Sequence, residues 1–216
     1  MRNEEQHCRS TGSVPWILEA SIGLGDEPNS SVDCSEPVSL SLSDGRAVKV
    51  GGRIDRIDKI GGEDSLEFSI WDYKTGSSWA FDSADPFKQG RKLQPYLYAG
   101  MLRHRVVASV AAEAKVNYFG YFFPSPKNEG LRLKWTTAEL RSGDQILRHI
   151  CDAISNGAFV ATNEASDCKF CDYRPICGEP DEIAEASLVQ LENCDHEALD
   201  SIRALRGLSL EELPPF

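Results

Sequence analysis

The alternation of apolar and polar residues predicts three strands in the first half of the chain. Residues 38–42 alternate valine and leucine with serine, the pattern of a half-buried strand. Residues 44–45 (Asp-Gly) are a tight-turn signal, and 47–60 are expected to return as a second strand. The Gly-Gly pair at 61–62 predicts another turn, which brings 66–75 back as a third strand.

The third predicted strand has apolar side chains on both of its faces. Phe68 and Ile70 fall on one face, and Trp71 and Tyr73 fall on the other. A strand that is apolar on both sides is typical of the middle of a layered sheet. We therefore expect this strand to be a central one.

The second half of the chain alternates predicted helices and strands. Residues 94–105 are expected to form a helix, and 115–124 and 131–135 to form strands. Residues 136–139 (Thr-Thr-Ala-Glu) have the form of a capping box, which predicts a helix ending near Gly157. This order predicts an α/β (α+β) fold, with a mixed central sheet flanked by helices.

The two ends of the chain differ in composition from the middle. Residues 1–36 are polar, with one apolar island at 14–18, so little regular structure is expected there. Residues 37–178 are expected to hold the sheet domain and a cysteine-rich knuckle at its end. Residues 179–216 form an acidic tail in which the spacing of leucines predicts one or two amphipathic helices.

The composition is that of an ordinary globular chain. Hydrophobic residues make up 41% and charged residues 26% of the 216 residues. No apolar run is long enough to span a membrane, and the first residues lack the apolar core of a signal peptide. The seven cysteines are odd in number and partly clustered, which favours a reducing cytoplasm and a metal rather than disulfides.

The net charge of −11 argues against a nucleic-acid partner only when it is taken over the whole chain. The acidic excess lies in the two ends, whereas residues 37–178 hold nineteen basic and seventeen acidic residues. Residues 86–112 contain no acid and form a basic strip of Lys88, Arg91, Lys92, Arg103 and Arg105. Such a strip is the usual footprint of phosphate binding. A solvated helix face would look the same by charge alone.

Two carboxylates and a lysine are the candidate chemistry of the sheet. Asp72 and Lys74 are two residues apart and therefore face the same side of a strand. Asp55 lies on the neighbouring strand, so its carboxylate could converge with that of Asp72 on Mg²⁺ or Mn²⁺. Asp58 is a rival to Asp55, because residues three apart point to opposite faces and one of them alone can serve. A buried ion pair without catalytic meaning is the alternative for Asp72 and Lys74.

Three motifs together resemble the RecB-like branch of the PD-(D/E)XK nucleases. They are GRIDRID at 52–58, WDYKTG at 71–76, and the QxxxY pattern formed by Gln94 and Tyr98. The resemblance covers roughly residues 19–178 and implies a restriction-endonuclease-like fold. It implies a metal held by Asp55, Asp72 and the backbone carbonyl of Tyr73. It also implies that Lys74 is the catalytic lysine, and that Gln94 and Tyr98 orient the site or the DNA strand.

Three cysteines follow these motifs in a C-x2-C-x5-C pattern: Cys168, Cys171 and Cys177. In the helicase-associated nucleases of the AddB type, cysteines at this spacing hold a [4Fe–4S] cluster with a fourth cysteine far upstream. That resemblance implies that these three thiolates are cluster ligands. The upstream cysteine and a metal-binding histidine of the family have no clear counterpart, because His7 and Cys8 lie in a polar stretch without helical periodicity.

These observations predict a metal-dependent DNA nuclease domain of a helicase-associated repair or recombination protein, and exonuclease action is expected of it. The expected partners are DNA and a helicase domain or subunit. Because the histidine and the fourth cysteine are not found, we expect the chain alone to be a poor nuclease with no complete cluster. The alternatives are a DNA-binding or scaffolding module that keeps the fold, and a zinc-binding interaction domain. The zinc alternative leaves the DYKTG and QxxxY motifs unexplained.

Overall fold

The computed structural model describes residues 2–208, with side chains from Glu4 onward. The chain forms two compact units, divided between Asp144 and Gln145. The limits of the sheet domain expected from the sequence, 37 and 178, differ from this division, and they stay a prediction. No helix in the described part of the chain is both long enough and apolar enough to cross a membrane.

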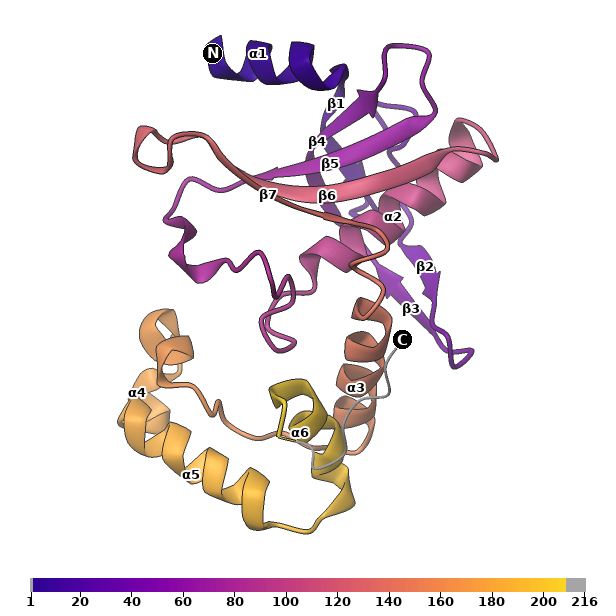
Figure 1. Ribbon diagram of the computed structural model, residues 1–216. Helices are drawn as coiled ribbons and strands as arrows, with labels where there is room; N and C mark the ends of the chain where they lie inside the picture. The colour runs from indigo at the N-terminus through magenta and orange to yellow at the C-terminus, as the bar shows by residue number, and fades with distance from the viewer. Residues whose placement is uncertain (1, 209–216) are drawn as a thin grey trace. The chain divides into compact units, whose positions relative to one another are not determined.

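The first unit is built on a five-stranded sheet in the order β1-β4-β5-β6-β7 (Figure 1). The strands are β1 (Ser13–Ile22), β4 (Gly52–Ile60), β5 (Glu67–Tyr73), β6 (Lys115–Phe123) and β7 (Leu131–Thr136). β5 and β6 are parallel, and every other neighbouring pair is antiparallel. The mixed sheet of a restriction-endonuclease-like fold is thereby confirmed, and β5 is its central strand.

Helices lie against both faces of this sheet. α2 (Gln94–Ser109) covers one face, where the ring of Tyr98 meets that of Phe119 at 6.3 Å between centroids. α1 (Arg2–Thr11) lies against the other face, where His7 meets Trp71 edge-on at 5.9 Å. Because successive residues of a strand point to opposite faces, the two helices contact alternate residues of the same strands.

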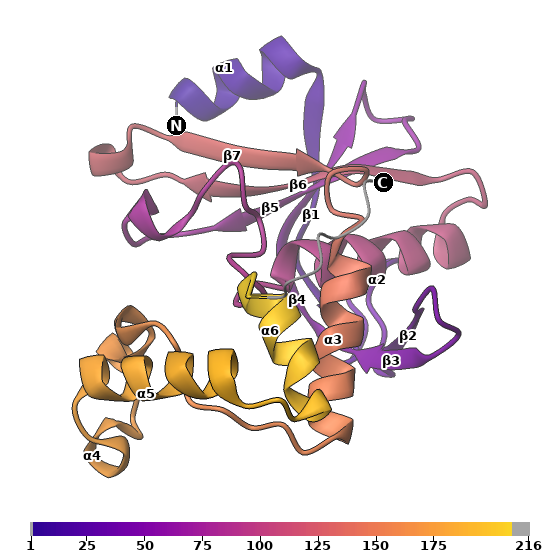
Figure 2. The same ribbon diagram turned by 60° about the horizontal axis from the view of Figure 1, so that its bottom comes forward.

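The expectation of one return strand over 47–60 is wrong, because the chain divides there at Gly51. β3 (Ala47–Val50) pairs with β2 (Val38–Ser41) in a separate two-stranded sheet, and β4 joins the main sheet. A Cβ at Gly51 would lie 2.8 Å from the carbonyl oxygen of Gly23, so only glycine allows the two backbones to approach there. Figures 1 and 2 show the β2–β3 pair beside α2, where Leu40 packs on Gly100.

The expectation of little regular structure in residues 1–36 is also wrong. α1 has two acids in its first turn and an exposed Glu5–Arg9 ion pair of 2.6 Å at helical spacing, both of which favour a helix. β1 is an edge strand, and its pairing with β4 shifts between Pro15 and Ile17. A proline and a bulge hide the alternation of residues on which a strand prediction depends.

The capping box at 136–139 forms, but it does not begin a helix. The backbone N–H of Thr136 donates to Glu139 at 2.7 Å, and the N–H of Glu139 donates back to the Thr136 hydroxyl at 3.3 Å. The residues between them make a turn, and α3 (Gly143–Ser155) begins later. Gly143 lies so close to the ring of Tyr96 that a side chain at this position would collide with it.

The second unit is helical. It contains α5 (Pro180–Asn193) and α6 (Asp200–Arg206), which confirm the helices expected in the acidic tail, and the short α4 (Arg174–Cys177). Leu191 and Leu199 are buried in the small core of this unit with Ala153 and Ala158. Three 3-10 turns also belong to the chain beyond α2: η2 (Pro126–Asn128) in the first unit, and η3 (Ala165–Phe170) and η4 (Glu197–Leu199) in the second. Residues 209–216 of the tail lie outside the described residues.

Candidate active site

The pairing of β4 with β5 brings two predicted site residues together. Arg56 pairs with Trp71, and the same antiparallel register carried one residue further places Asp55 opposite Asp72. The backbone N–H of Tyr73 donates to Asp55 Oδ2 at 2.7 Å, which fixes this carboxylate at the end of β5. The sheet therefore holds both carboxylates at one place, where strand β5 ends.

Lys74 and Gln94 bind the carboxylate of Asp72 from two directions. Lys74 Nζ lies 2.5 Å from Asp72 Oδ2, and Gln94 Nε2 donates to Asp72 Oδ1 at 2.5 Å. Lys74 Nζ also donates to Gln94 Oε1 at 3.2 Å, so the three side chains close a ring of contacts. Gln94 is the first residue of α2, and the helix thereby ties the loop after β5 to the site.

The carboxylate of Asp72 is buried, with the residue only 3% exposed, and its surroundings disfavour its charged form. Burial raises the pKa of Asp72 and the charge of Asp55 adds to this rise, while the contacts with Lys74 and Gln94 act against it. Two carboxylates that repel each other in a buried place are stabilised by a cation between them. The electrostatics of the site thus favour a bound positive charge.

Tyr98 completes the set of residues on this face. Burial raises the pKa of its hydroxyl, and the charges of Asp72 and Asp55 raise it further, while a hydrogen bond with Gln94 lowers it. A Cβ built on Gly52 would lie 3.1 Å from Tyr98 Cε1. The structure therefore brings together the five residues that the sequence proposed as catalytic, which are Asp55, Asp72, Lys74, Gln94 and Tyr98.

Tyr121 and Phe81 also belong to the site, although the sequence analysis did not name them. The hydroxyl of Tyr121 donates to Gln94 Oε1 at 3.4 Å, and Lys74 Nζ lies 5.1 Å from the centre of its ring. Phe81 packs edge-on against Tyr121 at 4.7 Å. The pairing of Asp72 with Tyr121 across β5 and β6 was the signal that could have found Tyr121.

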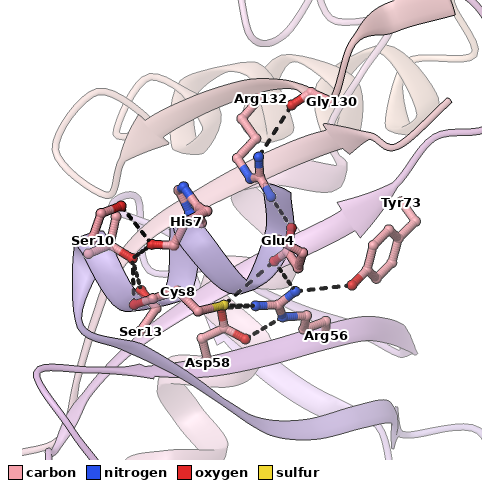
Figure 3. A network of polar contacts seen from close by, with 11 residues as sticks. Glu4, His7, Cys8, Ser10, Ser13, Arg56, Asp58, Tyr73, Gly130 and Arg132 are labelled. Carbon is pink, nitrogen blue, oxygen red and sulfur yellow. Dashed lines mark hydrogen bonds and ion pairs between the residues drawn. The ribbon is translucent and has the colours of Figure 1, made fainter. Parts of the chain in front are cut away.

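Asp58, the rival of Asp55, lies on the opposite face of the sheet. It is completely buried, and its two oxygens accept from Arg56 Nε at 2.5 Å and Arg56 Nη2 at 2.7 Å (Figure 3). Arg56 in turn donates to Glu4 of α1 and to the hydroxyl of Tyr73. Because its carboxylate is committed to Arg56, the geometry supports Asp55 rather than Asp58 as the site residue.

His7 and Cys8 lie on a helix, contrary to the expectation of a stretch without helical structure. Both belong to the network on the face of Asp58 (Figure 3), where Cys8 Sγ lies 3.4 Å from Arg56 Nη2. His7 contacts Trp71, whose side chain points away from the face of Asp72. In the part of the chain that the structure describes, no three His, Cys, Asp or Glu side chains converge as a metal site.

The basic strip divides into residues of different roles. Arg105 donates to the backbone carbonyls of Val32 and Asp33 at 2.7 and 3.0 Å, so this residue holds a loop. Lys88 and Lys92 lie close enough together, and Lys92 close enough to Lys74, for their charges to act on one another. The lysines of the strip thus extend from the site, while DNA binding by Lys88, Arg91 and Lys92 stays a prediction.

The three knuckle cysteines lie in the second unit with free thiols. Cys168 is in η3, Cys177 ends α4, and Cys171 lies between these two turns. Cys171 and Cys177 are exposed, and Cys168 is partly so. Their role as cluster ligands stays a prediction.

The chain belongs to the PD-(D/E)XK nuclease superfamily, whose pattern it matches over residues 2–178. It is also similar to one of the subunits of the bacterial ATP-dependent helicase/deoxyribonuclease. The Bacillus mycoides protein is 32% identical over 130 residues, or 58% of this chain. A Bacillus cereus protein is 37% identical over 93 residues, or 43% of this chain. The chain spans 10% and 7% of the lengths of these two relatives.

Proposed function

We propose that this chain is the metal-dependent DNA nuclease domain of a helicase-associated protein of DNA repair or recombination, and that it acts as an exonuclease. The observation that carries the proposal is the meeting of Asp55, Asp72 and Lys74 on one face of the sheet. A buried carboxylate held between a lysine and a glutamine, with a second carboxylate opposite, is a costly arrangement in a protein without a charged ligand.

The donor set fits Mg²⁺ or Mn²⁺ with an incomplete shell of protein ligands. Asp55 and Asp72 supply carboxylate oxygens, and the carbonyl of Tyr73 lies between Asp72 and Lys74 in the chain. These are hard oxygen donors, and Mg²⁺ commonly keeps several waters beside one or two carboxylates. When bound, such an ion polarises a phosphate and lowers the pKa of water.

The residues around the carboxylates have roles that follow from their contacts. Lys74 is held 2.5 Å from Asp72, so its ammonium would neutralise charge that develops on a phosphate oxygen at the same place. Gln94 contacts both Asp72 and Lys74 and would keep the two in position when their mutual attraction weakens on substrate binding. Tyr98 would support Gln94 from the next turn of α2.

DNA as substrate and a helicase as partner are proposed on two grounds. The lysines of the basic strip lie in the loop that leads from Lys74 to Gln94, beside the carboxylates. The relatives are named helicase/deoxyribonuclease subunits, and the matching part is a small fraction of their length. A nuclease domain joined to a strand-separating enzyme would receive unwound ends, which is the reason for proposing exonuclease action.

The test combines metal binding with cleavage. Mn²⁺ should raise the thermal stability of the protein, because an ion that binds only the folded state stabilises it. Asp72→Asn and Lys74→Ala should each abolish cleavage of DNA while the variants stay folded, and Asp72→Asn should also abolish the stabilisation by Mn²⁺. Lys115→Ala, at the far end of β6, is the control and should leave both unchanged. A Lys74→Ala variant that cuts at the parent rate would place the active site elsewhere.

A second candidate function is a DNA-binding or scaffolding module with little or no activity. One observation favours it, since no third His, Cys, Asp or Glu joins Asp55 and Asp72 among the described residues. The two functions differ in a single experiment. A scaffold would bind DNA in Mg²⁺ and leave it intact over hours, and its affinity would not depend on Lys74 more than on the other lysines.

A further inference from the structure

The loop between β5 and α2 contains a turn that is held in an unfavourable conformation. The loop runs from Lys74 to Leu93 and includes η1 (Ser78–Ala80). Lys88 and Gln89 have φ values of 46° and 53°, and Gly90 follows with 77°. Two successive residues with side chains in the left-handed region are strained, and such strain concentrates at functional sites.

The carboxylate of Asp85 locks this turn. It accepts the backbone N–H groups of Phe87 at 3.0 Å, Lys88 at 2.8 Å and Gln89 at 3.1 Å. The N–H of Lys92 then donates to the carbonyl of Phe87 at 2.9 Å, and the side chain of Phe87 is buried. The position of Lys92 is therefore fixed by the backbone of the turn and not by a flexible loop.

Lys92 and Lys74 lie over two rings that pack against each other. Lys92 Nζ is 3.2 Å from the centre of the Phe81 ring, and Lys74 Nζ is 5.1 Å from that of Tyr121. Phe81 and Tyr121 meet edge-on at 4.7 Å. An aromatic face attracts a cation and offers it no carboxylate, so the charge of Lys92 stays available to an anion.

The charge of Lys92 has no ion-pair partner within residues 2–208. Burial lowers the pKa of Lys92 to about 8, and the positive charges of Lys88 and Lys74 contribute to this decrease. Lysines that repel one another and lack counter-ions are stabilised by a ligand with negative charge. Lys74, by contrast, is paired with Asp72.

We propose that Lys92 is a second active-site lysine, which binds the phosphate group that is cleaved, and that the turn locked by Asp85 exists to position it. This inference rests on the proposed nuclease function and deepens it. Lys88 and Arg91 belong to the flanking surface and bind neighbouring phosphates of the strand. Lys92 differs from them because the Phe81–Tyr121 pair links it to Lys74 and Gln94.

The first test separates cleavage from binding in the full chain. Lys92→Ala should lower the rate of cleavage at saturating DNA on the order of 10²-fold, the effect of removing one group that stabilises developing charge. Lys88→Ala should act mainly on the affinity for DNA, and exposed Lys115→Ala should change neither. Lys92→Met keeps the apolar stem and serves if the alanine variant is unstable. A Lys92→Ala variant that loses affinity only would overturn the inference.

The second test does not depend on cleavage. With Ca²⁺ in place of Mg²⁺, the amines are labelled with an acylating reagent near pH 8, with and without DNA, and the modified lysines are identified by mass spectrometry. DNA should protect Lys92 strongly and Lys115 not at all. A parent protein that binds DNA without cutting it would contradict the proposed nuclease, and the protection of Lys92 would then decide the inference alone. Equal labelling of Lys92 with and without DNA would show that the inference is wrong.

Discussion

The ring of Tyr98 lies directly against the backbone of Gly52. A Cβ at position 52 would come within 3.1 Å of Tyr98 Cε1 and 3.5 Å of its hydroxyl oxygen. The contact joins the glycine of the GRIDRID motif on β4 to the tyrosine of the QxxxY motif on α2. Two motifs that are far apart in the sequence are thus one packing unit beside the carboxylates.

The first prediction is that Gly52→Ala displaces Tyr98 and lowers cleavage. A methyl group at this distance forces the ring to move by a few tenths of an ångström, and overpacking typically costs about 1–3 kcal/mol of unfolding free energy. The cost should shrink in a Tyr98→Ala background, where the ring is absent. Urea unfolding of the four proteins of this double-mutant cycle measures the coupling. Additive costs would mean that the contact does not exist in solution.

The second prediction distinguishes the two aspartates of the IDRID run. Asp58→Ala leaves the buried Arg56 without its bidentate partner, so the unfolding free energy should fall by about 3–5 kcal/mol. Asp55 is only partly buried, and Asp55→Ala should cost far less while it abolishes stabilisation by Mn²⁺. Urea unfolding with and without Mn²⁺ gives both numbers. If Asp58→Ala abolished Mn²⁺ binding and kept its stability, the assignment of the two would be reversed.

Much of the fold was predictable because the strands 38–42 and 66–75 show their burial in their alternation. β1 was missed since Pro15 lies at a bulge, and Leu18, at 63% exposure, is on the outside of an edge strand. The break at Gly51 was missed because its cause is the approach of Gly23, a contact between distant residues. Local patterns hold no information about such contacts.

The candidate site was predictable through its motifs but not through its geometry. Asp55 and Asp58 are equivalent in sequence, and the choice depends on where Arg56 points. The contribution of Tyr121 depends on the parallel pairing of β5 with β6, which local sequence does not determine. The left-handed turn at Lys88 and Gln89 runs against the preferences of these residues, so no propensity could have indicated it.

The third prediction concerns α1 and acid pH. Glu4 joins α1 to Arg56 and Arg132 (Figure 3). Burial raises the pKa of Glu4, but the hydrogen bond from Arg56 and the charges of both arginines outweigh it and hold the pKa below 4.5. The stabilisation is therefore complete above the unfolded value and is lost as the pH falls through the lower folded value.

Glu4→Gln is the matched variant for this prediction. The difference in melting temperature between the parent and Glu4→Gln should be constant at neutral pH and should shrink below about pH 4, where Glu4 becomes protonated in the parent. Thermal unfolding followed by circular dichroism from pH 7 to acid measures it. The subtraction removes the contributions of other carboxylates. A difference that does not change with pH would mean that Glu4 is not paired in the folded protein.

The fourth prediction is that the basic strip binds the DNA backbone without sequence preference. Replacing Lys88, Arg91 and Lys92 by Glu should weaken binding to every sequence alike. It should also lower the dependence of the affinity on salt, because each lost phosphate contact removes about one released counterion from the slope. Fluorescence anisotropy on two unrelated oligonucleotides at several salt concentrations measures both effects. Unchanged affinity would identify the strip as a solvated surface, and Lys115→Glu is the charge control.

The last prediction concerns the iron–sulfur cluster. A four-iron cluster needs four thiolates, and the knuckle supplies three: Cys168, Cys171 and Cys177. Cys8 is a poor fourth ligand because burial raises the pKa of its thiol, despite the nearby Arg56, and because it is bonded within the network of Glu4. Cys34 Sγ donates to the carbonyl of Glu36 at 3.3 Å. We therefore expect that this chain by itself binds no stable cluster and is a slow nuclease.

Anaerobic reconstitution with iron and sulfide checks this expectation. The purified chain should show no broad absorbance near 400 nm, about where thiolate–iron charge transfer falls, and its iron content should be far below four per chain. Without a cluster the three cysteines would take up zinc weakly, because a fourth ligand is missing. A stable stoichiometric cluster would contradict the prediction, and Cys8→Ser and Cys34→Ser would then identify the fourth ligand. If neither substitution removed the cluster, one of Cys151 and Cys194 would have to supply it, since these are the cysteines that remain.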